Sequence, residues 1–429
     1  MFGFANFLLL ALFAAAVFDL IFALARGGGL RGALHGLWNT PHLLFGQQLA
    51  EWRLQLGRIL FAAGLAAYEI SVVFCNSMAR QNWAWVQGVM SPVLEWLAFL
   101  CFGAKILFGT RYTWRELLAG GALYFIARWV YFNSQNIWWI GIVVAVLAAK
   151  DVPLRRPLQV YFASGCAAMA VVLALHFAGI VAPDLTSERM GALRGTYGYG
   201  HPNTFGGLVF GLVLAYALLR AQKVRWVDCL LVFAIGVFLL VGPASRSAAL
   251  CMLALTVGLV FCRLRAGHSV PRCWPGTCAG MVGLTAAVSY LLPLLVIKVG
   301  PWNNDIGPAW LAKLDSLLTC RISLTWMAYR LLDVKIAGQV FNWPTVDNSF
   351  AFALFQFGPV VAALLGILFA AALWGHAKQG RQVEVCCLFA MLAYAYMEVQ
   401  PFHLTTNPTA LLLCGAVFAQ TSARWQKIE

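Results

Sequence analysis

Apolar stretches about as long as a bilayer is thick recur along the whole chain, and they limit the folds open to it. A transmembrane helix needs about 20 predominantly apolar residues, because backbone groups in lipid must be hydrogen-bonded within the segment. Residues 4–25, 157–181 and 277–298 are stretches of this kind. Only 11% of the residues are charged, whereas soluble domains have roughly 25%. We therefore expect an all-α, polytopic integral membrane protein.

The lengths of the apolar stretches predict about 12–13 transmembrane helices. They are expected at residues 4–25, 56–75, 93–109, 116–132, 136–149, 157–181, 204–219, 226–242, 247–262, 277–298, 348–373, 384–400 and 408–420. We divide the chain into an N-terminal helix with a basic connection (residues 1–55) and a membrane core (residues 56–429). The long loop 299–347 has apolar residues at helical spacing from Leu311 to Leu332, which predicts one or two amphipathic helices at the membrane surface.

Basic residues gather in every second loop and so predict the orientation. Most of the 30 Lys and Arg lie in these alternate loops, which the positive-inside rule places in the cytoplasm. The C-terminus is then cytoplasmic, and the net charge of +14 does not call for a nucleic-acid partner. The 12 Cys lie mostly inside apolar runs without metal-ligand spacing, so no metal and no cofactor are expected.

Four segments are then expected on the outer face, namely residues 182–203, 243–247, 299–347 and 401–407. The stretch Arg194–Gly207, RGTYGYGHPNTFGG, is a compact polar turn between two apolar runs. Its glycines allow tight turns and close approach to a ligand. A plain loop with Pro202 and Asn203 starting the next helix is the alternative interpretation.

Unexpected arginines lie in these outer segments: Arg189, Arg194, Arg246 and Arg321. The positive-inside rule disfavours them there, so each needs a partner. A guanidinium grips a phosphate or pyrophosphate with two parallel hydrogen bonds. An outer carboxylate or a lipid headgroup is the alternative partner.

Two further outer residues have side chains suited to proton transfer. His201 could act as a general base or as a hydrogen-bond donor to a leaving group, or it could simply cap the helix that starts near Pro202. Asp347 could accept a proton from a sugar hydroxyl, or it could be a helix N-cap. His403 is a second outer histidine. Tyr197 and Tyr199 could stack on sugar rings, although interfacial aromatic belts also explain such residues.

Glu69, Glu95 and Glu398 fall within apolar runs, where carboxylates are costly and often functional. They raise proton-coupled transport as an alternative, although each is isolated or near a span end. The chain has no recognisable nucleotide-binding motif. An enzyme with outward-facing cations and no nucleotide site suggests a substrate that a lipid already carries on the outer leaflet.

Four short stretches together resemble the signatures of Wzy-type polysaccharide polymerases. Arg194 followed by the His201-Pro202-Asn203 stretch resembles their "R…LGF.HPN..G" signature. The other three are Ser245–Ser247, which resembles "SRT/SRS"; Leu314–Ile322, which resembles "LNSLLSGRI"; and Val346–Phe350, which resembles "LDNSY". Cys320 stands where the family has Gly, Asp315 where it has Asn, and Phe350 where it has Tyr. The resemblance runs from about residue 56 to the C-terminus.

The resemblance implies a glycosyltransferase of the bacterial cytoplasmic (inner) membrane with an outward-facing active site. Such enzymes join oligosaccharide repeat units carried on undecaprenyl pyrophosphate, so membrane lipid and a chain-length regulator are implied partners. Arg194, Arg246 and Arg321 would bind the pyrophosphates, and His201 or Asp347 would take the acceptor proton. The residues expected to contact substrate are Arg189, Tyr197, Tyr199, Asn203, Asn348 and His403.

Two rival functions remain open. An O-antigen ligase would transfer a lipid-linked glycan to another acceptor with the same arginine and histidine chemistry. A transporter of lipid-linked sugars would show inverted repeats and polar residues near mid-membrane.

Overall fold

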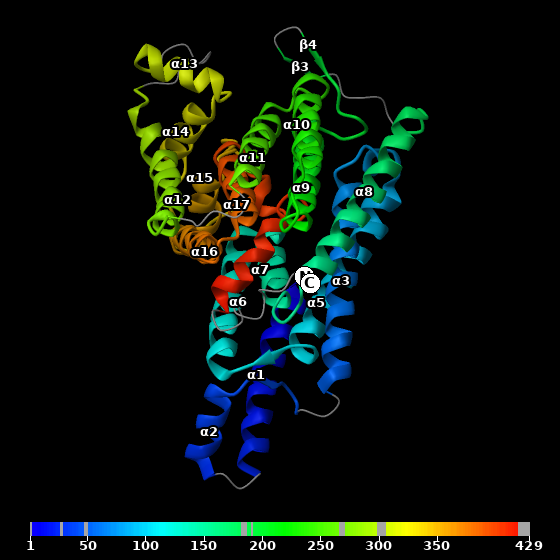
Figure 1. Ribbon diagram of the computed structural model, residues 1–429, viewed down its shortest axis with the longest axis vertical. Helices are drawn as coiled ribbons and strands as arrows, with labels where there is room; N and C mark the ends of the chain where they lie inside the picture. The colour runs from blue at the N-terminus through cyan, green and yellow to red at the C-terminus, as the bar shows by residue number, and fades with distance from the viewer. Residues whose placement is uncertain are drawn as a thin grey trace.

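The structure is a computed structural model that describes residues 2–25, 29–46, 50–181, 187–189, 192–265, 271–297 and 306–418. Nearly all regular structure within these ranges is helical. The long helices run side by side and form one elongated bundle (Figure 1). The all-α fold expected from composition is therefore confirmed.

The long helices are α1 (Phe2–Ala25), α3 (Ala50–Cys75), α5 (Ser91–Phe108), α6 (Trp114–Ser134), α8 (Arg155–Phe177), α9 (Pro202–Leu219), α10 (Trp226–Val241), α11 (Arg246–Leu264), α12 (Trp274–Leu291), α16 (Pro359–Lys378) and α17 (Gln382–Met397). The shorter helices are α2 (Gly29–Asn39), α4 (Ala79–Asn82), α7 (Ile137–Ala148), α13 (Ala309–Leu317), α14 (Arg321–Leu331), α15 (Ser349–Phe352) and α18 (Cys414–Val417). Two antiparallel pairs of short strands complete the fold: β1 (His42–Leu43) with β2 (Arg111–Tyr112), and β3 (Ser187–Arg189) with β4 (Ala192–Arg194).

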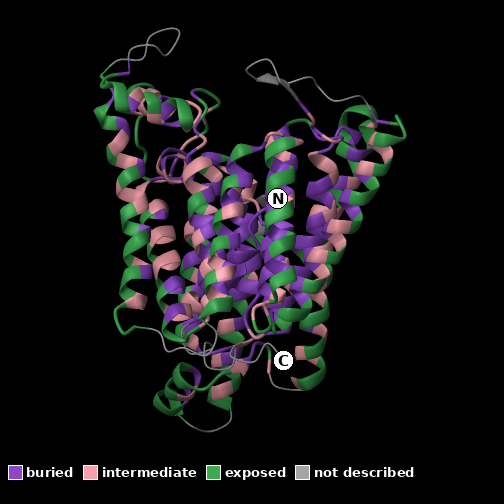
Figure 2. Ribbon diagram, turned by 45° about the horizontal axis from the view of Figure 1, so that its top comes forward, coloured by how far each residue is buried: buried purple, intermediate pink, exposed green. Residues whose placement is uncertain are grey.

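Eight helical segments in the described ranges are long and apolar enough to cross a membrane. The shorter apolar helices α7, α10 and α17 lie among them. Buried residues gather in the middle of the bundle, while the helices at its rim expose many side chains (Figure 2). Exposed side chains on the rim helix α10 include Val227, Leu230 and Val241. Such a surface suits lipid, and the protein is a multi-pass membrane protein.

The N-terminal connection is more ordered than the sequence predicts. α2 occupies residues 29–39 and α3 begins at Ala50, so helix replaces much of the connection expected over residues 26–55. Arg53 of α3 donates to the carbonyls of Leu44 and Gly46, at 2.6 and 2.7 Å. The turn between β1 and α3 is thereby fixed against the bundle.

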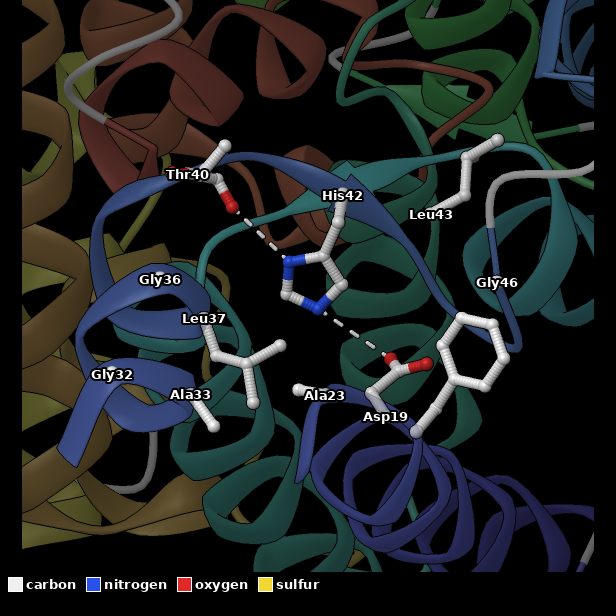
Figure 3. Close-up of a pocket in the computed structure, with 11 residues that line it drawn as sticks. Asp19, Ala23, Gly32, Ala33, Gly36, Leu37, Thr40, His42, Leu43 and Gly46 are labelled. Carbon is white, nitrogen blue, oxygen red and sulfur yellow. Dashed lines mark hydrogen bonds and ion pairs between the residues drawn. The ribbon is translucent and has the colours of Figure 1, made fainter. Parts of the chain in front are cut away.

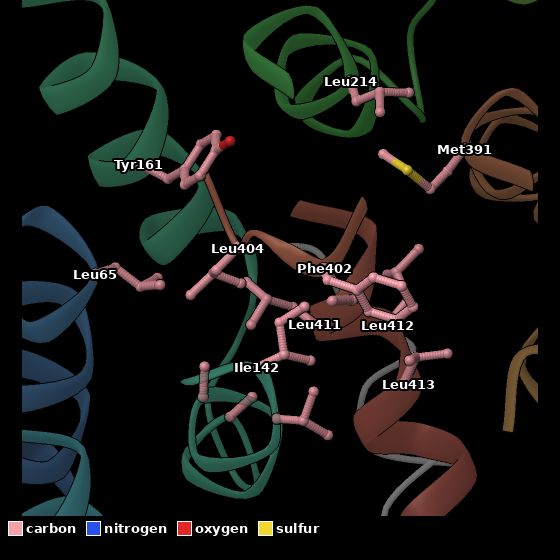
Figure 4. Close-up of a cluster of buried hydrophobic side chains, with 14 of the residues drawn as sticks. Leu65, Ile142, Tyr161, Leu214, Met391, Phe402, Leu404, Leu411, Leu412 and Leu413 are labelled. Carbon is pink, nitrogen blue, oxygen red and sulfur yellow. The ribbon is translucent and has the colours of Figure 1, made fainter. Parts of the chain in front are cut away.

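The chain after α17 contradicts one expectation and confirms another in part. We expected an outer turn at 401–407, but the chain descends into the bundle there after a 3₁₀ turn, Gln400–Phe402. The helix expected over 408–420 is present over Pro408–Val417, as the 3₁₀ helix Pro408–Leu413 followed by α18. Figure 4 shows Phe402, Leu404 and Leu411–Leu413 of this segment packed among side chains of the surrounding helices.

Glycines of α9 make room for this descending segment. A Cβ at Gly207 would lie 1.9 Å from Oε1 of Gln400, and one at Gly211 would lie 2.6 Å from the carbonyl oxygen of Thr405. Non-helical backbone is tolerated at membrane depth only where protein surrounds it. Because α9 has glycines at these contacts, the segment can lie directly on the helix backbone.

A single helix over 348–373 is also wrong. α15 passes into a π-helical turn, Ala353–Phe357, and ends at Gly358, after which α16 starts at Pro359. Gly358 has φ 88°, and a Cβ there would lie 2.1 Å from the carbonyl oxygen of Ile336. The sequence carries the signal in Gly358-Pro359, because proline disfavours helical conformation in the residue before it.

The two short helices expected in the long loop are present as α13 and α14. Asp315 of α13 joins them, because its Oδ1 accepts the backbone N–H groups of Ile322 and Ser323 at 2.8 and 3.1 Å. α14 begins at the same end of the bundle as α9 and α11, near β3 and β4 (Figure 1). We call this end the motif end.

Candidate functional site

Arg194 ties the end of β4 to two helix starts at the motif end. Its guanidinium is buried and donates to the carbonyls of Pro243 and Ala244, in the turn before α11, at 3.4 and 3.1 Å. Its Nη2 also donates to Oδ1 of Asn203, in the first turn of α9, at 3.0 Å. Arg194 therefore holds the Gly-rich loop against both helices.

His201 caps α9 and lies on the surface. Its Nδ1 accepts the backbone N–H of Asn203 at 3.1 Å. A backbone N–H can only donate, so Nδ1 carries the lone pair and the neutral ring holds its proton on Nε2. In this state His201 offers an N–H donor at Nε2 rather than a basic lone pair.

Arg321, the first residue of α14, is buried and fully hydrogen-bonded within the protein. A guanidinium has five N–H groups. They donate to the carbonyls of Met397 and Leu318 and to the side chains of Thr319, Ser247 and Glu398. A phosphate ligand would have to displace one of these partners.

Glu398 is the residue on which the motif stretches converge. It follows the last residue of α17, and its Oε1 accepts from Nη2 of Arg321 at 2.6 Å and from Nδ2 of Asn203 at 3.0 Å. Its carboxylate is also hydrogen-bonded to the Ser247 hydroxyl, and its backbone carbonyl accepts from the Ser349 hydroxyl at 2.6 Å. Each of the four sequence stretches thus supplies a contact.

Burial raises the pKa of the Glu398 carboxyl above its ordinary value, while the Arg321 guanidinium opposes that rise. Asp347 adds to it, because a second carboxylate nearby disfavours ionisation. Residues at the starts of α9, α11 and α14 contact the Glu398 carboxylate or its partner Arg321. Helix N-termini favour negative charge. These contacts partly offset the burial that disfavours the ionised carboxylate.

Two charged side chains at this site are open to solvent. Arg246 is the first residue of α11 and is exposed. Asp347 has a 31% exposed side chain, and its Oδ2 lies 3.9 Å from Nη2 of Arg321. Together with His201, they are the predicted site residues placed where a ligand could reach them.

Other predicted contacts take part in packing. Tyr199 is fully buried, and its ring centroid lies 5.7 Å from that of Phe205. The Tyr197 ring lies 5.0 Å from the same phenylalanine. Asn348 caps α15 and donates to Ser289 and to the carbonyl of Tyr396, at 3.1 and 3.0 Å. These interactions account for all three residues without a ligand.

One predicted residue does not join the cluster. His403 lies inside the bundle on the descending segment, with its ring centroid 3.8 Å from that of Trp138 in α7. Its expected place in an outer turn is therefore wrong. Arg189 belongs to β3, and its side chain lies outside the described part of the structure.

An apolar cavity of about 90 Å³ lies directly beneath the polar cluster. Ser349, whose hydroxyl binds the Glu398 carbonyl, lines it, as do Tyr290 of α12 and Phe369 of α16. Nearly all of its other lining residues are apolar. At about 90 Å³ the cavity is much smaller than a ligand pocket of roughly 300–1,000 Å³, so it is a packing gap beside the polar cluster.

A second cavity, of about 310 Å³, lies between α1, α2 and β1 (Figure 3). His42 points toward Asp19, with 3.5 Å between Nε2 and Oδ2, and its Nδ1 lies 3.1 Å from the Thr40 carbonyl oxygen. Burial lowers the pKa of His42, but the hydrogen bonds to Asp19 and Thr40, together with the Asp19 charge, raise it by a larger amount. The net pKa of His42 therefore lies above its ordinary value. The pair links α1, which contains Asp19, to β1, which contains His42.

Sequence reasoning gave little weight to Glu398 and did not select the Asp19–His42 pair. A carboxylate within or beside an apolar run is the sequence signal that could have identified Glu398 and Asp19. It did not reveal their partners, since Arg321 is far from Glu398 in sequence and His42 far from Asp19.

No family model, curated protein or solved structure matches this chain. The inferred function therefore rests on the geometry of the site and on the resemblance of the four sequence stretches.

Proposed function

We propose that the protein is a membrane glycosyltransferase of the Wzy type, which joins lipid-linked oligosaccharide repeat units into a polysaccharide. The observation that carries this proposal is the convergence on Glu398. Four stretches that resemble polymerase signatures lie far apart in sequence, yet Asn203, Ser247, Arg321 and Ser349 all contact this one residue. Independent loops would have no reason to gather in this way.

Local backbone geometry also supports the resemblance. Cys320 has φ 64°, a left-handed conformation that favours glycine, and the polymerase signature has Gly at this place. Asp315 caps α14 through its carboxylate, and the Asn of the signature has an amide oxygen suited to the same role. Both departures from the signature are compatible with one loop structure.

The proposed reaction transfers a sugar from a lipid pyrophosphate to a hydroxyl. The bond between the anomeric carbon and the pyrophosphate oxygen breaks, the hydroxyl oxygen bonds to that carbon, and lipid pyrophosphate leaves with its negative charge. Arg246 and the Nε2–H of His201 stabilise the leaving oxygens. Asp347 accepts the hydroxyl proton, because its carboxylate is accessible and the His201 lone pair is engaged.

The buried arginines have a supporting role in this scheme. Arg194 and Arg321 add positive potential but hold backbone carbonyls and side chains in place. The lipid tail would enter the membrane beside the apolar cavity under Ser349. The motif end would face outward from the bacterial cytoplasmic membrane, where a chain-length regulator could also bind.

The test is a polymerisation assay on purified protein in nanodiscs, with the lipid-linked repeat unit of its host. Arg246→Ala is compared with Arg263→Ala, because both arginines are exposed and lie at opposite ends of α11. We expect a product ladder from wild type and from Arg263→Ala. We expect Arg246→Ala to lower kcat by about 100-fold or more, since it removes a contact to the developing charge.

Two results would overturn the proposal. Folded wild type that leaves its own repeat unit unconsumed is not a polymerase. A normal ladder from Arg246→Ala removes that residue from the mechanism. Addition of a single glycan to a separate acceptor, without a ladder, would instead establish an O-antigen ligase.

One observation favours the transport alternative. The descending segment is non-helical between its two 3₁₀ turns, where Thr405, Thr406 and Asn407 lie in the interior. Tyr161, which donates to the Thr405 carbonyl, also interacts electrostatically with the buried Glu69. Discontinuous spans of this kind bind substrates or ions in transporters. Movement of lipid-linked sugar across proteoliposomes by wild type, without bond formation, would favour that function.

A further inference from the structure

We propose that Glu398 is the positioning residue of this site. Its carboxylate holds the Asn203 side chain in one orientation and Arg321 in place, and thereby sets the geometry of Arg194 and His201. The inference rests on the proposed function for its kinetic consequence, but the contacts stand independently of it. Glu398 is 4% exposed and does not reach the surface, so it acts through its neighbours.

The first step concerns the Asn203 amide. Its Nδ2 donates to Oε1 of Glu398, and its Oδ1 accepts from Nη2 of Arg194. The flipped amide would place Oδ1 against a carboxylate and the NH₂ group against a guanidinium, and both contacts would be repulsive. A charged residue 398 therefore selects one amide orientation, whereas a neutral amide at 398 would accept either.

The second step leads from Asn203 to the exposed histidine. The backbone N–H of Asn203 donates to Nδ1 of His201 and so selects its tautomer. Through its side chain, Glu398 fixes the residue that makes this bond. A loosened Asn203 leaves the His201 ring free to turn its donor away from the leaving group, and a misplacement of about 1 Å can cost about 100-fold in rate.

The third step concerns Arg321 and the charge of the cluster. The guanidinium bonds to Glu398, to the Met397 carbonyl and to two residues of the turn before α14. The titratable or charged groups that interact with Glu398 are Arg321, Asp347, Cys251 and Tyr394. Arg194 lies one contact further away, because it bonds to Asn203. Without the carboxylate, Arg321 loses its ion pair with Glu398, and its guanidinium becomes accessible to reagents in solution.

The experiment compares Glu398→Gln with Glu384→Gln in the full-length protein. Glu384 is a matched control, because it is also a buried glutamate and lies in the first turn of α17, the helix that ends just before Glu398. One readout is independent of activity: phenylglyoxal modification of Arg321, measured by peptide mass spectrometry on protein shown to be folded. The second readout is kcat, KM and the pH profile of polymerisation.

We expect Arg321 to be protected in wild type and Glu384→Gln, and modified several-fold faster in Glu398→Gln. We expect Glu398→Gln to lower kcat by about 10- to 100-fold, with a smaller change in KM. Wild-type activity should fall at low pH as Glu398 takes up a proton. Because burial raises the pKa of Glu398, this acidic limb of the pH profile should lie at a pH above the ordinary glutamate pKa range. Glu398→Gln should lack that limb.

The outcomes separate the two proposals. If wild type makes polymer and folded Glu398→Gln matches it in kcat and pH profile, Glu398 is not a positioning residue. If wild type makes no polymer, the proposed function fails, and Arg321 protection alone decides the role of Glu398. Unchanged protection in folded Glu398→Gln would overturn the inference in either case.

Discussion

At the scale of single residues, the site depends on a buried ion pair whose members come from distant parts of the chain. Arg321 and Glu398 both have nearly inaccessible side chains, 7% and 5% exposed. The desolvation of two such charges is repaid only with good geometry and further hydrogen bonds. Arg321 has both, since all its N–H groups are used.

Removal of one member of this pair should destabilise the protein strongly. We expect Arg321→Met to lower the free energy of unfolding by about 3–5 kcal/mol, because Glu398 is left buried without a cation. The double variant Arg321→Met/Glu398→Leu should recover part of this loss. Thermal unfolding in detergent measures both, and a double variant less stable than the single one would contradict the account.

How much of the site the sequence predicts is clearest for His201 and Arg321. The capping role of His201 follows from the Pro202 beside it, and the structure has that cap. The partner of Arg321 does not follow, since the sequence offers several outer carboxylates and no rule to choose Glu398. The pairing depends on where the tertiary fold places the start of α14 relative to the end of α17, and the local sequence pattern does not contain that information.

At the scale of elements, the contact between α9 and the descending segment is decided by glycines. Gly207 and Gly211 are one turn apart on the same face of α9. A Cβ at either position would overlap an atom of the descending segment. Tyr161 of α8 donates to the Thr405 carbonyl of this segment, and its hydroxyl lies beside Gly211. The segment therefore contacts both α8 and α9.

A methyl group at Gly211 should therefore separate these elements. We expect Gly211→Ala to destabilise the protein by about 1–3 kcal/mol through overpacking against the Thr405 backbone. Gly283→Ala in α12 is the control, because a Cβ there meets nothing within 4 Å, and it should be neutral or stabilising by about 0.5–1 kcal/mol. Equal thermal stabilities of the two variants would argue against the contact.

The sequence predicts elements well where one helix face decides them. The apolar spacing between Leu311 and Leu332 predicts α13 and α14, which are present. It is less accurate after α17, where a stretch rich in Leu and Ala predicts one α-helix from Pro408 onward, whereas the chain forms a 3₁₀ helix over Pro408–Leu413 before α18. Tertiary contacts override that propensity, because Asn407 binds the Pro401 carbonyl and the Ala410 N–H and so tightens the turn.

At the scale of the whole molecule, the motif residues share one end of the bundle, and the Asp19–His42 cavity lies apart from them (Figures 1 and 3). Charge patterning predicts that the motif end faces away from the cytoplasm. This prediction is separate from the chemistry and can be tested without substrate.

An impermeant thiol reagent should distinguish the two ends. The variant Ser316→Cys places a thiol on α13 at the motif end, and native Cys273 is exposed at the start of α12, at the opposite end. We expect labelling of residue 316 in intact cells and of Cys273 only after permeabilisation, both assigned by peptide mass spectrometry. The reverse pattern would invert the orientation and the proposed site with it.

The descending segment also has a consequence for how the protein is made. Residues 400–413 pack among α7, α8, α9 and α17, and the ribosome produces them after all four of these helices. The space that they fill is therefore among the last parts of the core to be occupied during synthesis. A nascent chain that stops before residue 400 has these helices but lacks the buried side chains that fill the space between them.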